Sequence, residues 1–140
     1  MTSRDKIVIY ADGGARGNPG PAAIGAVVLD PGTDPPTCLA TVSERIGVAT
    51  SNVAEYRAVI AGLEAARAFP ARAVSLRADS MLVIRQLEGT WKVKKEHLRP
   101  LHAQAQALLA DYDDVDLAHV PREENVDADL LVNAALDAEG

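Results

Sequence analysis

Four acidic residues occupy positions from which they could bind metal ions together: Asp12, Glu55, Asp79 and Asp129. Asp12 closes an apolar run at residues 7–10 that is typical of a buried strand, and Asp79 closes a similar run at residues 74–78. Carboxylates brought together repel one another unless cations bind between them. Two divalent ions about 4 Å apart need such a cage of oxygen ligands, and they promote in-line displacement at phosphorus. The four acids therefore indicate a divalent-metal site for phosphoryl transfer.

Each acid also has an ordinary structural explanation. Asp12 could be a turn residue, and Asp79 could cap a helix. Glu55 could be the acid of a capping box with Asn52, in the first turn of a helix. Asp129 could be surface charge. Two acids at the ends of two strands of one sheet would be a coincidence, however, because ligands of open α/β sheets bind beyond the carboxyl ends of the strands.

The apolar periodicity predicts the elements that must position these acids. A loop rich in Gly and Pro is expected at residues 13–21, directly after Asp12. Short turns between the first three strands favour an antiparallel meander, and the helices that separate the later strands favour parallel neighbours. The sequence thus predicts one α/β domain over residues 1–140, a mixed five-stranded sheet with helices on both faces. Strands are expected at residues 7–10, 22–29, 38–46, 74–78 and 115–120, and helices at about 52–69, 80–87, 98–108 and 124–138.

The last predicted helix carries an apolar stripe beside Asp129. The stripe contains Leu130, Leu131, Ala134 and Ala138.

Composition limits the class of protein. The 140 residues are 48% hydrophobic and carry a net charge of −6, which excludes a general polyanion-binding protein. Basic residues nevertheless gather between Arg85 and Arg99, around Trp91, although a solvated surface is the commoner meaning of such a run. Cys38 is the one cysteine, and neither a signal peptide nor a membrane-spanning run is evident, so a cytoplasmic protein is expected.

Four motifs resemble type 1 ribonuclease H, in its compact bacterial and archaeal form. They are YADGGARGNPGP, TSNVAEYRAVIAGLEAA, ADSMLVIRQLEG followed by TWKVK, and HVPREENVDAD, in the family's order. The resemblance implies the ribonuclease H-like fold, with strand order 3-2-1-4-5. It implies cleavage of the RNA strand of an RNA–DNA hybrid, with 5′-phosphate and 3′-hydroxyl products. The four acids match the family's ligands for two Mg²⁺ ions, for which Mn²⁺ can substitute.

The same resemblance implies substrate contacts. Backbone near the glycines could approach the minor groove, where RNA displays its 2′-hydroxyls. The position of Thr50 holds a DNA-strand phosphate in the family, and those of Trp91 and Lys92 grip the DNA strand. The expected substrate-binding residues are Gly13, Gly14, Arg16, Gly17, Asn18, Thr50, Ser51, Asn52, Trp91, Lys92 and Lys94.

Two positions depart from the family pattern, and one catalytic role has two candidates. Met81 stands where a Gln is frequent, and Val132 where an Ala is frequent. His119 lies ten residues before Asp129, at the spacing of a histidine that assists catalysis in many members. Compact members use an Arg seven residues before the fourth acid, which is Arg122 here, and Arg122 is favoured over His119.

Two other functions compete with the hybrid-specific ribonuclease. A non-catalytic hybrid-binding module would have no need of four clustered carboxylates. Another nuclease of the same fold, such as a resolvase or exonuclease, would have no need of the Asn18 loop and the Trp91–Lys92 pair. A monomer is expected, since the family is usually monomeric. Whether the chain is part of a longer protein stays open.

Overall fold

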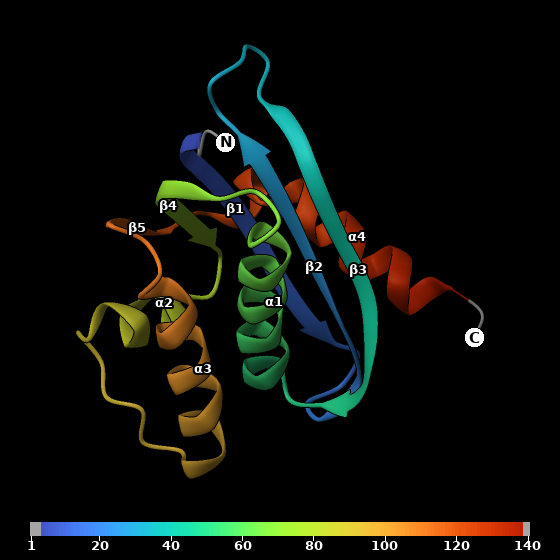
Figure 1. Ribbon diagram of the computed structural model, residues 1–140. Helices are drawn as coiled ribbons and strands as arrows, with labels where there is room; N and C mark the ends of the chain where they lie inside the picture. The colour runs from blue at the N-terminus through green and yellow to red at the C-terminus, as the bar shows by residue number, and fades with distance from the viewer. Residues whose placement is uncertain (1–3, 139–140) are drawn as a thin grey trace.

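The computed structural model describes residues 4–138, which form a five-stranded sheet in the order β3-β2-β1-β4-β5 (Figure 1). β1 pairs antiparallel with β2, and β2 with β3, whereas β4 runs parallel to both β1 and β5. The predicted sheet order is therefore confirmed. The strands are β1 (Arg4–Ala15), β2 (Gly20–Asp30), β3 (Thr37–Ala49), β4 (Ala71–Ala78) and β5 (Asp114–His119).

The helices cover both faces of this sheet, as predicted. In Figure 1, α1 lies in front of the central strands and α4 behind them. Ile7, Ile9 and Tyr56 belong to the main core beneath α1, and Ala23 packs with Val132 on the other face. The helices are α1 (Ser51–Ala66), α2 (Met81–Glu88), α3 (Arg99–Leu109) and α4 (Val126–Asp137), with short 3₁₀ turns η1 (Glu96–Leu98) and η2 (Arg122–Glu124).

The predicted glycine loop after Asp12 is wrong in its extent. Gly13 and Gly14 continue β1 and pair with β2, so the turn contains only residues 16–19. A Cβ on Gly13 would lie 2.2 Å from the carbonyl carbon and oxygen of Ala54. The glycine is therefore needed because α1 lies directly against the strand, and not because the chain turns there.

The predicted capping box of Asn52 and Glu55 is also wrong. Thr50 is the N-cap of α1, and its side chain accepts a hydrogen bond from the backbone N–H of Val53 at 3.3 Å. Thr50 adopts the extended backbone that a cap requires, so the helix begins at Ser51. Glu55 consequently lies beyond the first turn and is not a capping residue of this helix.

The predicted apolar stripe of α4 is wrong as well. Leu130 is 60% exposed, and Ala134 and Ala138 are also exposed. The buried face consists of Ala128, Val132 and Ala135. A Cβ on Gly25 of β2 would lie 2.3 Å from the carbonyl oxygen of Ala128, so the helix rests closely on the sheet through small residues.

Candidate active site

Three of the predicted metal ligands meet at one edge of the central strands. Ala11 and Ala78 are paired in the parallel register of β1 and β4, so Asp12 and Asp79 follow at the same level. Gly13 lets α1 approach, and this close approach brings Glu55 to the same place. Ligand atoms of Asp12, Glu55 and Asp79 lie within 4.8 Å of one another. A set of carboxylate oxygens at this spacing fits a hard divalent cation such as Mg²⁺.

The electrostatics of the cluster favour a bound cation. Asp12 is only 5% exposed. Burial, together with the charges of Asp79 and Asp129, raises the pKa of Asp12 from 3.8 to about 8. Burial raises the pKa of Glu55 well above its ordinary value, and the charges of Asp12 and Asp79 raise it further. Ionised together, these groups are destabilised, and a divalent ion between them would remove that penalty.

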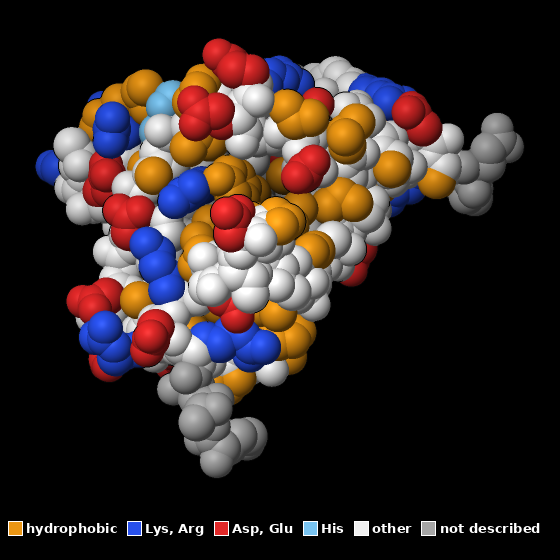
Figure 2. All heavy atoms as spheres, turned by 90° about the horizontal axis from the view of Figure 1, so that it is seen from above, with side chains coloured by type: hydrophobic (Ala, Val, Ile, Leu, Met, Phe, Trp, Pro, Cys, Tyr) orange, Lys and Arg blue, Asp and Glu red, His pale blue; other side chains and the backbone are white. Residues whose placement is uncertain are grey.

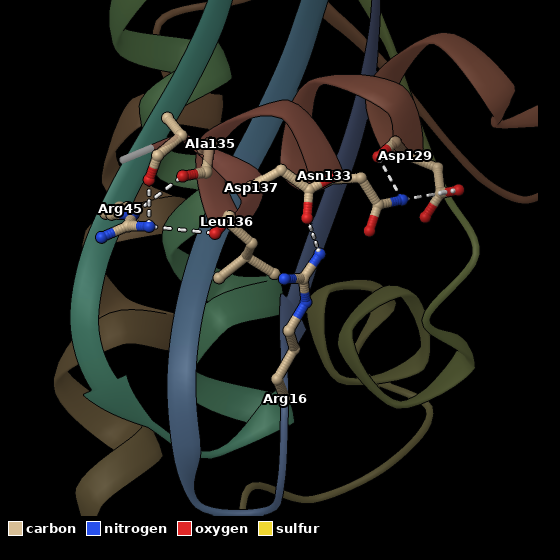
Figure 3. Close-up of polar contacts among 8 residues, drawn as sticks. Arg16, Arg45, Asp129, Asn133, Ala135, Leu136 and Asp137 are labelled. Atoms are coloured by element: carbon tan, nitrogen blue, oxygen red, sulfur yellow. Dashed lines mark hydrogen bonds and ion pairs between the residues drawn. The ribbon is translucent and has the colours of Figure 1, made fainter. Parts of the chain in front are cut away.

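Asp129 stands beside this group of three acids. It comes from the first turn of α4 and raises the pKa of Asp12 both by its charge and by a side-chain hydrogen bond. Asn133 Nδ2 donates to the backbone oxygen of Asp129 at 3.1 Å and lies 3.4 Å from its Oδ2, as Figure 3 shows. The fourth acid is thus oriented by its own helix toward the cluster.

Of the two candidate assisting residues, Arg122 faces the acids. Its guanidinium lies 3.4 Å from Asp129 Oδ1. The negative charge of Asp129, followed by that of Asp12 and Asp79, raises the pKa of Arg122 above its ordinary value. His119 is exposed at the end of β5, level with Ala78 in the register.

The β1–β2 turn and the start of α1 come together beside the acids. The backbone N–H of Ser51 donates to Asn18 Oδ1 at 3.1 Å. This bond joins two of the segments expected to bind substrate. Arg16 points elsewhere, because its guanidinium pairs with Asp137 at 2.5 Å, near the end of α4 (Figure 3).

Arg45 of β3 also contacts this end of α4. It donates to the backbone oxygens of Ala135 at 2.8 Å and Leu136 at 2.9 Å, and to that of Ala138. These contacts satisfy carbonyls that the last turn of a helix leaves unpaired. Arg45 therefore fixes the helix that carries Asp129.

A groove of about 510 Å³ runs from the start of α1 to the segment after α2. Trp91 lies on this segment with 44% of its surface exposed, so it is not a core residue. The lining residues include lysines but no acidic residue, so the groove has a positive character that suits a nucleic-acid strand. By contrast, acidic and basic side chains are interspersed over the end where β1 begins (Figure 2). The groove is lined by Asn52, Leu82, Gln86, Thr90, Trp91, Lys92, Lys94, Lys95 and Leu98.

Two further residues near the acids and the groove, Gln86 and Asn133, were given no role by the sequence pattern. Gln86 is a buried polar residue among the apolar residues of α2, and such an interruption of a helix stripe was the available signal. Asn133 lies one helical turn after Asp129, where an amide could bond to the carboxylate. Gln86 lies within the motif ADSMLVIRQLEG, but the resemblance assigned it no role, and Asn133 follows the last of the motifs.

The strand order, with one acid on β1 and another directly after β4, defines a protein of the ribonuclease H-like fold class. The chain belongs to the reverse transcriptase-like family, whose pattern it matches over residues 10–135. No helix within residues 4–138 is long and apolar enough to cross a membrane.

Curated relatives include known ribonucleases. The bifunctional protein Rv2228c of Mycobacterium tuberculosis is 50% identical over 133 residues, which is 95% of this chain and 36% of that protein. Ribonuclease HI of Halobacterium salinarum is 46% identical over 134 residues, which is 94% of this chain and 65% of that protein. The chain thus spans about a third of the mycobacterial protein and just under two thirds of the halobacterial one.

Solved structures agree with this assignment. The N-terminal RNase H domain of Rv2228c has a TM-score of 0.89 at 49% identity, covering 94% of this chain and 99% of that one. LC11-RNase H1, from compost, was solved in complex with an RNA/DNA hybrid; it has a TM-score of 0.84 at 40% identity, covering 94% of this chain and 96% of that one. The resemblance to type 1 ribonuclease H is therefore confirmed.

Proposed function

We propose that this chain is a metal-dependent endoribonuclease that cleaves the RNA strand of RNA–DNA hybrids. The observation that carries the proposal is the convergence of Asp12, Glu55 and Asp79, whose ligand atoms lie within 4.8 Å of one another. Two similar proteins support the proposal. The halobacterial relative is a ribonuclease HI, and LC11-RNase H1 was solved in complex with an RNA/DNA hybrid.

The four acids are proposed to hold two Mg²⁺ ions, with Mn²⁺ as a substitute. Held by these acids, such ions would supply Lewis-acid chemistry: a more acidic water for attack on phosphorus and stabilisation of the leaving oxygen. The products would carry 5′-phosphate and 3′-hydroxyl ends. Asn133 orients Asp129, and Arg122 places an exposed positive charge beside Asp129, where it can meet a phosphate. His119 is the alternative to Arg122 for this assisting role.

The two strands of the hybrid are proposed to contact different parts of the protein. The backbone at Gly13, Gly14 and Gly17 would meet the minor groove of the RNA strand beside Asn18, Ser51 and Asn52. The DNA strand would lie along Thr50 and the groove, stacking on Trp91 while Lys92 and Lys94 neutralise its phosphates. Arg16 would reach substrate only by leaving Asp137, and this exposed ion pair is weak.

We also propose a domain organisation, an oligomeric state and a cellular location for this protein. Residues 1–140 would act as a single ribonuclease H domain, as a monomer in the cytoplasm. An exposed thiol at Cys38 fits a reducing compartment.

A panel of labelled substrates tests the proposed function. RNA–DNA hybrid, RNA duplex, DNA duplex and single-stranded RNA are incubated with Mg²⁺ or with a chelator. We expect Mg²⁺-dependent cutting of the hybrid alone, in its RNA strand. The matched variants are Asp12→Asn, which should lose cutting, and Asp113→Asn, an exposed acid that should keep it. Binding of the hybrid without cutting would indicate a binding module, and cutting of DNA would indicate another nuclease of this fold.

A further inference from the structure

The segment that forms one wall of the groove has little secondary structure of its own. α2 ends at Gly89, which adopts the left-handed conformation (φ 85°), and regular structure resumes only at η1. The intervening residues include Trp91 and Lys92, on which the proposed grip on the DNA strand depends. Something other than a helix or strand must therefore fix this segment in the shape that lines the groove.

The Gln86 side chain supplies such an anchor. Its Nε2 donates to the backbone oxygen of Lys92 at 3.2 Å, and its Oε1 accepts from the hydroxyl of Tyr56 at 2.5 Å. Gln86 is 4% exposed and Tyr56 is fully buried. Because the Lys92 carbonyl can only accept, the amide orientation is determined, and Tyr56 must donate to the remaining oxygen.

The anchor is itself held by neighbouring elements. The ring of His102, on α3, lies 3.1 Å from the backbone oxygen of Gln86, and Gln106 donates to the backbone oxygen of Leu87 at 2.9 Å. Tyr56 directly follows Glu55 on α1. The chain of contacts therefore runs from the helix that carries a proposed metal ligand to the wall of the groove.

We propose that Gln86 is a positioning residue that holds the Trp91–Lys92 segment in the conformation that binds the DNA strand. This inference rests on the proposed function for its consequence but not for its geometry. Without the anchor, the segment would occupy the binding conformation only part of the time. The apparent affinity for hybrid would fall by the same factor, while the acids and the chemical step would be unaffected.

Two readouts test the proposal, one without substrate and one with it. Trp91 is the single tryptophan of the chain, so its fluorescence reports on the segment directly. In Gln86→Met, we expect emission at longer wavelength and stronger quenching by acrylamide. For cleavage of labelled hybrid, we expect KM to rise about tenfold while kcat stays within about twofold of wild type.

Three further variants separate positioning from loss of stability. Tyr56→Phe removes the hydroxyl that aims the amide, and it should shift both readouts in the same direction by a smaller amount; it carries the test if Gln86→Met does not fold. Val83→Ala weakens the buried face of α2 without touching these hydrogen bonds, and Gln104→Met makes the same chemical change at an exposed site. Both should leave Trp91 emission and KM unchanged.

The outcomes are distinguishable from failure of the proposed function. Wild-type emission and KM in Gln86→Met would overturn the positioning role, and so would a fall in kcat at unchanged KM. Equal shifts in Val83→Ala would also overturn it, because general destabilisation would then explain the result. If the wild-type protein does not cleave hybrid but Trp91 responds to Gln86→Met as expected, the proposed function fails while the anchoring of the segment stands.

Discussion

Among the individual side chains, Asp12 has the largest consequence for how the protein responds to pH. Its folded-state pKa of about 8 lies above the ordinary value of 3.8, so the folded protein binds more protons than the unfolded chain between these values. Without metal, the free energy of unfolding should therefore fall as the pH rises from 4 to 8, by at most about 1.4 kcal/mol per pH unit for one group. Glu55 contributes in the same direction.

Substitution of Asp12 should remove most of this pH dependence. In the presence of a chelator, Asp12→Asn should unfold at higher urea concentration than wild type at pH 8, with the difference shrinking toward pH 4. Asp113→Asn, at an exposed site, is the control and should behave as wild type. Added Mg²⁺ should stabilise the wild type but not Asp12→Asn at pH 8. A difference that is constant with pH would contradict the burial and charge repulsion assigned to Asp12.

Arg122 and His119 can be separated by comparing their alanine variants. Arg122→Ala should lower kcat on hybrid roughly tenfold. This effect is smaller than that of removing a buried hydrogen-bond donor from an active site, because Arg122 is largely exposed. His119→Ala should stay near wild type, since Arg122 pairs with Asp129, whereas His119 is exposed at the end of β5. Arg72→Ala, which breaks an exposed ion pair with Asp114, serves as the control. Loss of activity in His119→Ala alone would reverse the assignment.

Among the elements, the close contact between β1 and α1 gives the sharpest test of the fold. Gly13→Ala should reduce the free energy of unfolding by about 2 kcal/mol or more, because the new methyl group would overlap the backbone of Ala54. It should also weaken metal binding by displacing Glu55. Gly14→Ala is the matched control: its Cβ would lie 3.4 Å from Val132 Cγ1, and stability should change by less than about 1 kcal/mol. Urea unfolding of both variants measures the difference.

The elements themselves could be predicted from the sequence, but their close contacts could not. The periodicity of the apolar residues and the positions of the turn residues were sufficient to predict the strands, the four helices and the parallel pairing of β1 with β4. The buried face of α4 was predicted wrongly because a Leu side chain is more hydrophobic than an Ala side chain and so dominates the prediction of an apolar stripe. The buried face instead contains Ala128, because Gly25 of β2 has no side chain and lets the backbone of Ala128 approach the sheet. This contact between α4 and β2 joins residues far apart in the sequence, so no local pattern predicts it.

The candidate site could be predicted to a similar extent. The acids were found because each follows a strand or lies in a family motif. The Tyr56–Gln86–Lys92 contacts were not found, since they join three segments only after the chain has folded. The cap at Thr50 was missed because Asn52 and Glu55 have the spacing of a capping box. The true N-cap lies two residues before Asn52.

For the whole molecule, the distribution of charge matters more than its sum. The net charge is −6, yet the groove presents Lys92, Lys94 and Lys95. Affinity for hybrid should fall as salt rises, because binding releases counterions from the phosphates. Lys92→Ala should reduce the slope of log K against log salt by about 1. Lys6→Ala, an exposed lysine of β1 outside the groove lining, should leave the slope unchanged. Equal slopes for both variants would argue against the groove as the path of a nucleic-acid strand.

The most direct measurement follows the two strands of one hybrid separately. The RNA strand and the DNA strand carry different labels, and wild type and Asp12→Asn are compared with Mg²⁺ and with a chelator. The account predicts internal cuts with 5′-phosphate ends in the RNA strand alone, only for wild type and only with Mg²⁺. Cutting that persists in Asp12→Asn or in chelator, or cutting of the DNA strand, would contradict it.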